Sequence, residues 1–392
     1  MRVLAVGNMY PPHHFGGYEL VWRAAMRHLE RNGHQVRVLT TDMDTGAAEP
    51  DDPNVRRDLR WYWRDHGFPP LSRWERARLE HHNARVLRRE LRDLGPDVVT
   101  WWSMGGMSLS MLERVRRARI PAVAFVHDDW LDYGREVDGW TRGRPQASGL
   151  LERLAERVVG APAGVDLEHA ARYVFVSETT RRRAREAGVD PPSTGVAHSG
   201  IDPGFIDPAP ERAWDWSLLY VGRLDERKGV DTAVTALVHL PDATLTLVGG
   251  WDAGEEGRLR ELADRHGVGA RLRFAGQRSR DEVRAAYAEA DAVVFPVRWE
   301  EPWGLVPLEA MARGRPVVAT GRGGSGEYLR DGENALLFEA GDAAALAAAV
   351  ERLADDPELR RRLREAGLET AGRHTEEHLN AAVLREIEAA VR

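Results

Sequence analysis

Short apolar runs alternate with longer amphipathic runs along most of this chain. The apolar run 2–8 predicts a strand, 18–33 predicts an amphipathic helix that closes on Asn32 and Gly33, and 34–41 predicts the next strand. This alternation is typical of parallel sheets whose strands are joined by helical crossovers. The pattern therefore predicts an α/β fold.

The alternation stops near residue 200 and then starts again. Segment 200–216 is rich in Pro, Gly and Asp, which is typical of a linker. We therefore expect two doubly wound domains, 1–202 and 203–375. The stretch from about 42 to 70 is dense in Asp, Pro and Arg and is predicted to be an excursion loop. Further strands are predicted at 97–102, 121–127, 172–177 and 194–200 in the first domain, and at 217–223, 243–250, 271–276, 291–297 and 316–320 in the second.

Composition narrows the class of protein. The chain has 392 residues, a formal net charge of −7 and no cysteine. The net negative charge argues against a nucleic-acid binder, and the lack of cysteine excludes disulfides and thiolate metal sites. No apolar run approaches the roughly 20 residues of a membrane span, and the first apolar run is too short for a signal peptide. We expect a cytoplasmic enzyme with its site in a cleft between the domains, beyond the carboxyl ends of the strands.

Almost all of the Lys and Arg residues in this chain are arginines. Lys228, in "RLDERKGVD", is the one lysine among the 55 Lys and Arg residues. Arg223 ends a predicted strand and Lys228 is expected to open the following helix, where free N–H groups favour phosphate. An arginine fork and a compact ammonium group suit the oxygens of a diphosphate in different ways. The pair therefore predicts a diphosphate site.

Two glutamates lie in the stretch 299–320. Glu301 follows a predicted strand, and Glu309 lies in the helix that begins near Gly304. The N–H groups of Gly304, Leu305 and Val306 point from that helix start and could cradle phosphate. A carboxylate accepts two hydrogen bonds and so suits paired sugar hydroxyls. Paired carboxylates also suit glycoside hydrolysis, but their place beside an anion site favours a nucleotide-bearing leaving group.

These motifs resemble the retaining glycosyltransferases of family 4, which have the GT-B fold. The resemblance covers nearly the whole chain and depends on "FGGYE" at 15–19, "VGRLDERKGVD" at 221–231, "EEPWGLVPLEAMARGRPVVAT" at 300–320 and "GGSGEYLRDGENALLF" at 323–338. It implies two Rossmann-like domains facing across a cleft, the first on the acceptor side and the second binding the nucleotide-sugar donor. It also implies that the last helix, 376–392, crosses back onto the first domain.

The resemblance assigns roles to individual residues. It implies that Arg223 and Lys228 hold the diphosphate, that Glu301 binds donor-sugar hydroxyls and that Glu309 binds the ribose. The remaining implied positions are Gly16 and Gly17 near the donor phosphate, the backbone of Gly304, Leu305 and Val306 against sugar and phosphate, His127 beside the donor sugar, and Arg278 near the base. Trp303 departs from the common phenylalanine, which puts the local size of the pocket in question.

Several other residues have both a structural and a functional interpretation. His127 follows a predicted strand and lies beside Asp128. This position favours a role in the site over a purely structural hydrogen bond. "DMD" at 42–44 and "HDD" at 127–129 are too short to indicate metal binding, and we expect no metal. "HHF" at 13–15 could meet the acceptor or form a structural loop. Ser177 is predicted to cap a helix.

Segment 71–94 is predicted to be a basic amphipathic helix. It has seven arginines and four acidic residues, which is only a modest excess of positive charge. We therefore favour a helix that exposes one face to water and packs an apolar stripe against the core. Some members of the family use such a surface to reach lipid acceptors. A peripheral membrane contact therefore stays open.

The prediction for function is transfer of a sugar from a nucleotide-diphosphate donor, with UDP or GDP favoured, to a hydroxyl acceptor. The resemblance implies retention by front-side attack, with the leaving phosphate assisting and no cofactor. The acceptor could be a small molecule, a glycan or a lipid-linked group. Two alternatives are a pyridoxal-phosphate enzyme using Lys228, which would be yellow, and a nucleotide-sugar-binding protein without catalysis.

Overall fold

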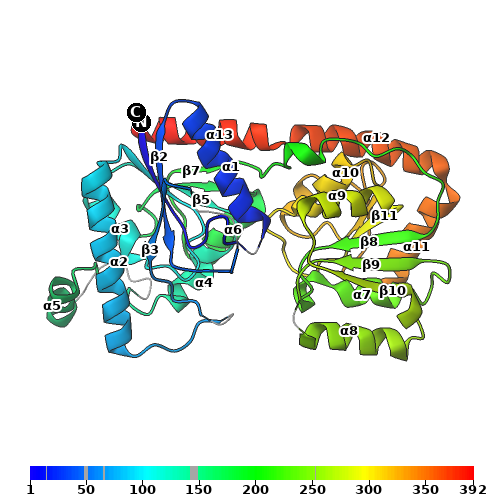
Figure 1. Ribbon diagram of the computed structural model, residues 1–392, viewed down its shortest axis with the longest axis horizontal. Helices are drawn as coiled ribbons and strands as arrows, with labels where there is room; N and C mark the ends of the chain where they lie inside the picture. The colour runs from blue at the N-terminus through cyan, green and yellow to red at the C-terminus, as the bar shows by residue number, and fades with distance from the viewer. Residues whose placement is uncertain (15, 48–51, 65–66, 142–148, 252) are drawn as a thin grey trace. The chain divides into compact units, whose positions relative to one another are not determined.

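The computed structural model describes residues 1–14, 16–47, 52–64, 67–141, 149–251 and 253–392. The chain divides into two compact units (Figure 1). The first unit comprises residues 1–198 and 379–392, and the second comprises 199–378. Each unit is described by itself.

The first unit is built on a seven-stranded parallel sheet. Its strand order is β3-β2-β1-β4-β5-β6-β7, so the chain reverses its direction of growth between β1 and β4. The strands are β1 (Arg2–Val6), β2 (Gln35–Thr41), β3 (Val55–Leu59), β4 (Val98–Trp101), β5 (Ala122–Val126), β6 (Arg172–Phe175) and β7 (Thr194–Val196). The helices are α1 (Gly17–Arg31), α2 (Arg73–Leu94), α3 (Ser110–Arg117), α4 (Trp130–Val137), α5 (Leu150–Val159) and α6 (Glu178–Glu186).

Strand β3 corrects the prediction of an uninterrupted loop over 42–70. It pairs with β2 at the edge of the sheet, with Val38 opposite Val55. Its sequence, VRRDL, is apolar only at its two ends, and only Val55 and Leu59 are buried. An edge strand keeps one side open to water, so it needs few apolar residues, and the apolar run that marks a buried strand is absent.

The local signals in the sequence explain the helices of the first unit. α1 ends at Arg31 with Asn32 as its C-cap, and Gly33 follows with a φ of +80° that suits glycine. The Ser72 hydroxyl accepts a hydrogen bond from the Glu75 backbone N–H and so caps α2. Ser177 caps α6 in the same way through the N–H of Thr180, as predicted. These caps fix where the long helices begin and end.

The second unit contains a six-stranded parallel sheet in the order β10-β9-β8-β11-β12-β13. Its strands are β8 (Ser217–Val221), β9 (Thr244–Val248), β10 (Leu272–Gly276), β11 (Ala292–Phe295), β12 (Val317–Ala319) and β13 (Leu336–Leu337). Its α-helices are α7 (Val230–Ala236), α8 (Ala253–Arg265), α9 (Arg280–Glu289), α10 (Leu305–Ala312), α11 (Ala343–Asp355) and α12 (Pro357–Arg373). Its 3-10 turns are η1 (Pro203–Phe205), η2 (Glu226–Lys228), η3 (Gly269–Arg271) and η4 (Gly324–Glu327).

The cores of both units consist of buried strand residues packed against helix faces. In the second unit, Leu218, Leu245 and Val294 from the sheet are almost fully buried with Leu346 and Val350 of α11. In the first unit, α2 contributes a buried face to the sheet while its other face is exposed (Figure 1). The last helix, α13 (Glu376–Val391), contributes its residues from Leu379 onwards to the first unit. The predicted α/β class and its two parallel sheets are confirmed.

Candidate functional site

The candidate site of the second unit lies where two neighbouring strands end. β8 and β11 are adjacent and parallel, with Val293 opposite Leu219, although they are far apart in the sequence. The chain reverses its strand order between them, and such switch points open a crevice beyond the carboxyl ends of the strands. The loop after β8 carries Arg223 and Lys228, and the loop after β11 carries Glu301. The topology therefore brings together the two motifs that the sequence singled out.

Lys228 does not open a helix, which corrects the prediction. It is the last residue of the 3-10 turn η2, and its N–H donates to the carbonyl of Asp225 at 3.0 Å. Gly229 follows with a φ of +65°, and α7 begins only at Val230. A Cβ at Gly229 would lie 2.1 Å from the carbonyl oxygen of Pro296, so close packing of the two loops requires glycine there. The ammonium group therefore owes its place to loop packing rather than to a helix dipole.

A three-residue cluster forms around one carboxylate oxygen. The Lys228 Nζ lies 2.6 Å from Glu301 Oε2, and Trp299 Nε1 donates to the same oxygen at 2.8 Å. The Lys228 ammonium also lies 5.2 Å from the centre of the Trp299 ring, and the Arg227 guanidinium lies 4.7 Å from it. Side chains of Lys228 and Glu301 are only 15% and 13% exposed, which strengthens their ion pair relative to one in open water.

The backbone around Glu301 is fixed by a glycine loop. Glu301 forms a parallel bridge with Gly323, and the N–H of Gly324 donates to the Glu301 carbonyl at 2.7 Å. Gly323 has a φ of +69°, and a Cβ there would lie 2.4 Å from the Glu301 nitrogen. The "GGSGE" motif thus acts by allowing two backbones to approach, which only glycine permits.

Arg223 lies on the same loop but in a more open position. Its side chain is 63% exposed, and its guanidinium lies 4.0 Å from Asp225. The Tyr220 hydroxyl donates to the Arg223 carbonyl at 2.7 Å, which fixes the backbone while leaving the side chain outside the core. Arg223 is therefore an exposed cation of the site, whereas Lys228 is a largely buried cation paired with Glu301.

The helix α10 begins next to Gly304, as predicted. Gly304 precedes the helix with a φ of +86°, and Leu305 and Val306 are its first residues. First-turn N–H groups have no partner within their own helix. The Gly304 carbonyl accepts a hydrogen bond from the buried Tyr328 hydroxyl, and Trp303 Nε1 donates to the Ser199 carbonyl at 2.9 Å. Trp303 is thus a buried support of this turn.

Glu309 lies one turn into α10 and is buried. It accepts a hydrogen bond from the Tyr287 hydroxyl at 3.0 Å, and the Arg280 guanidinium lies 3.8 Å away. Burial raises the pKa of Glu309 to about 7, against the weaker opposing effect of Arg280. Glu301 and Glu309 both raise the pKa of Tyr328, although burial of Tyr328 is the main cause of that rise.

Four contributors to this site were missed at the sequence level. Trp299 and Tyr328 hold the Glu301 segment, and Tyr287 and Arg280 surround Glu309. Trp299 could have been found, because it lies two residues from Glu301 in the same loop. Arg280 and Tyr287 lie on α9, and only the strand order reveals that α9 packs near α10.

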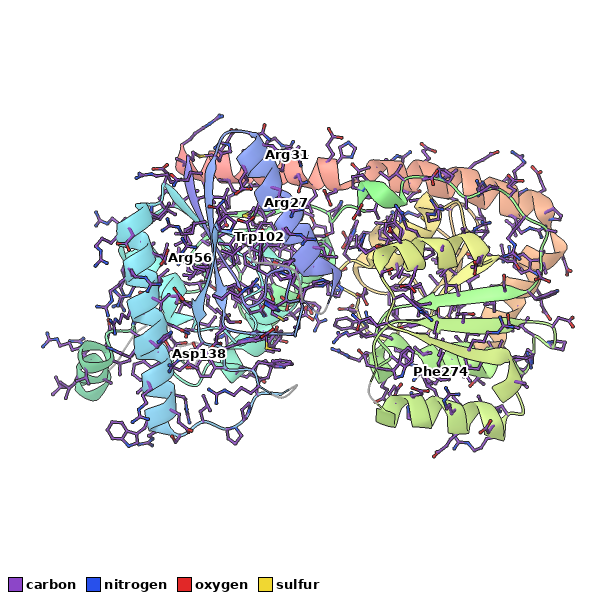
Figure 2. The ribbon with its side chains drawn as sticks, in the orientation of Figure 1. Arg27, Arg31, Arg56, Trp102, Asp138 and Phe274 are labelled. Atoms are coloured by element: carbon purple, nitrogen blue, oxygen red, sulfur yellow. The ribbon has the colours of Figure 1, made fainter. Side chains whose placement is uncertain are left out.

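The first unit assembles its predicted residues separately. Gly16 and Gly17 stand at the start of α1, where the Gly16 N–H donates to Glu19 at 3.2 Å. Tyr18 follows them, and its ring centre lies 4.7 Å from that of His127, which comes directly after β5. Burial lowers the pKa of His127 to about 3, so its imidazole is neutral at physiological pH. Trp102, labelled in Figure 2, stacks against Phe125 behind this histidine.

The other candidate motifs are engaged in structural contacts. Asp128 accepts a bond from Tyr133 at 2.9 Å, and Asp129 pairs with Arg183 at 2.8 Å. His13 lies 3.1 Å from the backbone nitrogen of Thr45 and near Asp44, whereas Phe15 falls outside the described residues. Arg278 pairs with Glu282 at 3.1 Å. Over the described ranges, no three His, Asp or Glu side chains gather in a way that could hold a metal ion.

Comparisons with known proteins define the class. Residues 15–205 match the family described as Glycosyltransferase Family 4, and residues 208–370 match Glycosyl transferases group 1. A glycogen synthase of Mycobacterium tuberculosis is 30% identical over 380 residues, covering 91% of this chain and 87% of the relative. The chain is therefore a glycosyltransferase of the GT-B type. It belongs to glycosyltransferase family 4.

Other similar proteins agree on this fold. A lipopolysaccharide core biosynthesis glycosyltransferase of Rhizobium meliloti is 40% identical over 169 residues, which cover 43% of this chain and 48% of that relative. The match thus spans about half the length of that relative. The sucrose-phosphate synthase structure from Thermosynechococcus elongatus superposes with a TM-score of 0.76 at 22% identity, covering 99% of each chain. An Anabaena HepE structure in complex with UDP-glucose gives 0.69 at 20% identity, covering 99% and 100%.

Among the helices of the described residues, none combines the length and the apolar character needed to cross a bilayer.

Proposed function

We propose that this glycosyltransferase moves a sugar from a nucleotide-diphosphate donor, UDP- or GDP-linked, to a hydroxyl acceptor with retention at the anomeric carbon. The observation that carries the proposal is the cluster of Lys228, Glu301 and Trp299 beside the exposed Arg223 and the first turn of α10. It combines cations for a diphosphate with a carboxylate for hydroxyl groups. The UDP-glucose complex of the Anabaena neighbour supports a nucleotide-sugar donor of this kind.

The charges suggest how the donor would bind. Arg223 and Lys228 would hold the diphosphate, and the N–H groups of Gly304, Leu305 and Val306 would bind the phosphate and the sugar edge. Glu301 would accept hydrogen bonds from sugar hydroxyls, and Glu309 from the ribose. In the first unit, Gly16, Gly17 and His127 are proposed donor contacts, with the neutral imidazole of His127 bonding a hydroxyl.

The chemical step follows from these charges. The bond between the anomeric carbon and the phosphate oxygen breaks while the acceptor oxygen bonds the same face of that carbon. The acceptor proton passes to the leaving phosphate oxygen. Negative charge grows on this phosphate, and fixed cations and N–H groups that stabilise it there lower the barrier. We propose that Arg223 and Lys228 supply this stabilisation without a metal ion.

A screen of nucleotide sugars tests the proposal. The purified protein is incubated with UDP- and GDP-sugars, and release of free nucleotide diphosphate is followed with and without candidate acceptors. We expect slow hydrolysis of one donor alone, acceleration by a small-molecule, glycan or lipid-linked acceptor, and an unchanged anomeric configuration in the product by NMR. Binding without any release, or an inverted product, would contradict the proposal.

Trp299 provides a first prediction about the site. Trp299→Phe keeps an aromatic face under Lys228 and Arg227 but removes the N–H that restrains Glu301. Loss of one hydrogen bond to a charged group costs about 2 kcal/mol, so we expect kcat with the nucleotide sugar to fall about tenfold or more. The affinity for the free nucleoside diphosphate should change little. Trp299→Leu removes the aromatic face as well. It should lower kcat and also weaken the affinity for the free nucleoside diphosphate.

Glu309 provides a prediction about pH. Its carboxyl is protonated in half of the molecules near pH 7, whereas the ionised form accepts both ribose hydrogen bonds. Nucleotide affinity should therefore rise from pH 6 to pH 8 and level off above that range. The amide of Glu309→Gln cannot titrate, so nucleotide affinity in this variant should not change with pH. That affinity should stay low over the whole range. Equal pH profiles for the two proteins, measured by calorimetry, would remove Glu309 from nucleotide binding.

A further inference from the structure

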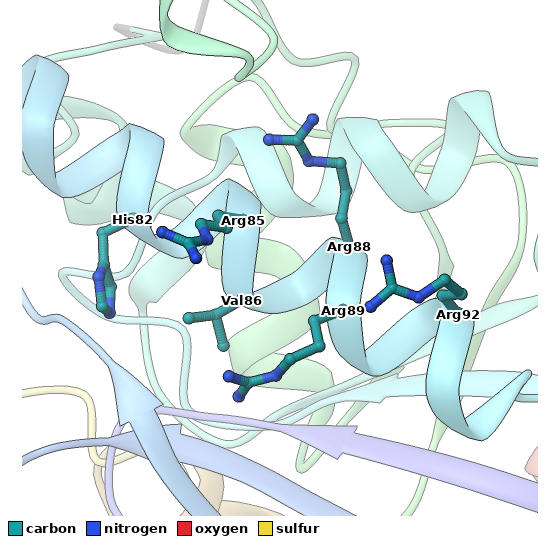
Figure 3. Close-up of a pocket in the computed structure, with 6 residues that line it drawn as sticks. All are labelled: His82, Arg85, Val86, Arg88, Arg89 and Arg92. Carbon is teal, nitrogen blue, oxygen red and sulfur yellow. The ribbon is translucent and has the colours of Figure 1, made fainter.

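A basic hollow lies on the exposed face of α2 in the first unit. It has a volume of about 470 Å³, within the range of small-molecule pockets. Figure 3 shows the four arginine side chains that extend from α2 around Val86, which is buried. The lining side chains are His82, Arg85, Val86, Arg88, Arg89 and Arg92.

The arginines of this hollow are spaced so that they repel one another. Arg85 lies three and four residues before Arg88 and Arg89, and Arg92 lies four and three residues after them. Like charges at these spacings are neighbours on a helix and destabilise it. Arginines on five other helices instead have a carboxylate three residues away, as Arg116, Arg181, Arg258, Arg284 and Arg361 show. The abundance of arginine in the chain therefore does not explain the cluster.

The acidic groups around the hollow neutralise only part of its charge. Arg89 pairs with Asp58 and with Glu90, which also binds Arg37. Arg92 pairs with Asp93 at 3.0 Å. Throughout the described residues, neither Arg85 nor Arg88 has a carboxylate within ion-pair distance.

A further cation lies beside Arg88. Arg114 donates to the Gly160 carbonyl, and Arg88 Nη2 would lie 3.3 Å from a Cβ placed at Gly160, so both guanidinium groups lie beside this residue. Burial and the charge of Arg88 lower the pKa of Arg114, whereas Glu156 raises it. His82 contacts the Asp58 carbonyl through Nε2 at 2.7 Å. The two exposed guanidinium groups of Arg85 and Arg88, which have no carboxylate within ion-pair distance in the part of the chain that the structure describes, leave a positive field over the hollow.

We propose that this hollow binds a small soluble polyanion carrying two or more phosphate groups. Arg85 and Arg88 would take the phosphates, because guanidinium forks bind phosphate oxygens in pairs. The concave shape and the buried Val86 favour a discrete ligand over a flat surface. Leu150, Leu154 and Val158 of α5 and Trp74 at the start of α2 are exposed apolar side chains that do not line the hollow, so a lipid surface is tested as the opposing outcome.

Calorimetric titration with sodium tripolyphosphate tests the site. The whole chain carrying Lys228→Ala serves as the parent protein. With this substitution, the proposed donor site should contribute little to the measured binding of tripolyphosphate. We expect one tripolyphosphate per chain, at least tenfold weaker binding after Arg85→Glu with Arg88→Glu, and loss of affinity in 0.5 M salt because charge interactions are screened. In the background with Lys228 intact, this double substitution should leave glycosyl transfer unchanged, which separates the site from the proposed function.

A matched control uses another exposed arginine pair. Arg27 and Arg31 stand four residues apart on α1 (Figure 2), so Arg27→Glu with Arg31→Glu makes the same charge change away from the hollow. It should alter tripolyphosphate binding less than twofold. Equal losses from both double variants would show non-specific attraction and overturn the proposal. Binding to phosphatidylglycerol vesicles without binding to tripolyphosphate would overturn it in favour of a membrane surface.

Discussion

Lys228→Ala is expected to lower glycosyl transfer by about 10²- to 10³-fold, the usual cost of removing one fixed donor from a developing anion. The Lys228 side chain is only 15% exposed and that of Arg223 is 63% exposed, so the charge of Arg223 is screened by water and should not replace that of Lys228. Steady-state kcat and kcat/KM measure the loss. The fold should persist, because Glu301 keeps the bond from Trp299 Nε1 and its backbone bridge to Gly323.

Lys228→Arg is the matched control for charge. It restores a cation but replaces a compact ammonium with a planar fork in a position only 15% exposed, against the Trp299 ring. We expect it to remain at least tenfold below the native enzyme, which would explain why one lysine is kept among so many arginines. Native turnover in Lys228→Ala, with an unchanged melting temperature, would remove the lysine from the mechanism.

Glu301→Gln is expected to separate sugar recognition from diphosphate binding. The amide keeps one acceptor for Trp299 but loses the charge that holds Lys228 and the capacity to accept bonds from two hydroxyls. Turnover of the nucleotide sugar should fall by about 10²-fold, as for the loss of a charged hydrogen bond in the transition state. Affinity for the free nucleoside diphosphate should hold or rise, because the ammonium no longer has a competing carboxylate.

Glu300→Gln is the control for Glu301→Gln. It makes the same chemical change at the neighbouring, partly buried position, outside the cluster of Lys228, Glu301 and Trp299, and should leave turnover within about twofold because the cluster keeps all its contacts. Calorimetry with the nucleoside diphosphate and kinetics with the sugar nucleotide complete the comparison. If Glu301→Gln weakened both ligands equally, the carboxylate would serve the loop's structure rather than the sugar.

The sheets were predictable because buried parallel strands leave apolar runs that end in glycine or polar residues. The runs 217–223 and 291–297 became β8 and β11, and the helix ends at Asn32 and Ser177 were readable from their capping chemistry. Strand β3 was not predicted, because it is an edge strand with only two buried side chains and therefore has no apolar run. β13 has two residues, Leu336 and Leu337, too few to show any period.

The site was predictable in its members but not in its contacts. Sequence singled out Lys228 and Glu301, yet their ion pair depends on β8 and β11 being neighbours, which no local pattern reveals. Lys228 was placed at a helix start because Gly229 was not recognised as a turn forced by the Pro296 carbonyl. Trp299 was one of 13 tryptophans, and its place two residues before Glu301 was the sequence signal that could have distinguished it.

The position of Lys228 has a practical consequence for chemical labelling. A chain with one lysine offers one ε-amine, and here that amine is shielded by a carboxylate and an indole ring. An acylating reagent should thus react slowly with the resting enzyme and faster when the carboxylate is removed. Ligand binding at the candidate site around Lys228 could then be followed by mass spectrometry, as protection of this single side chain from the reagent.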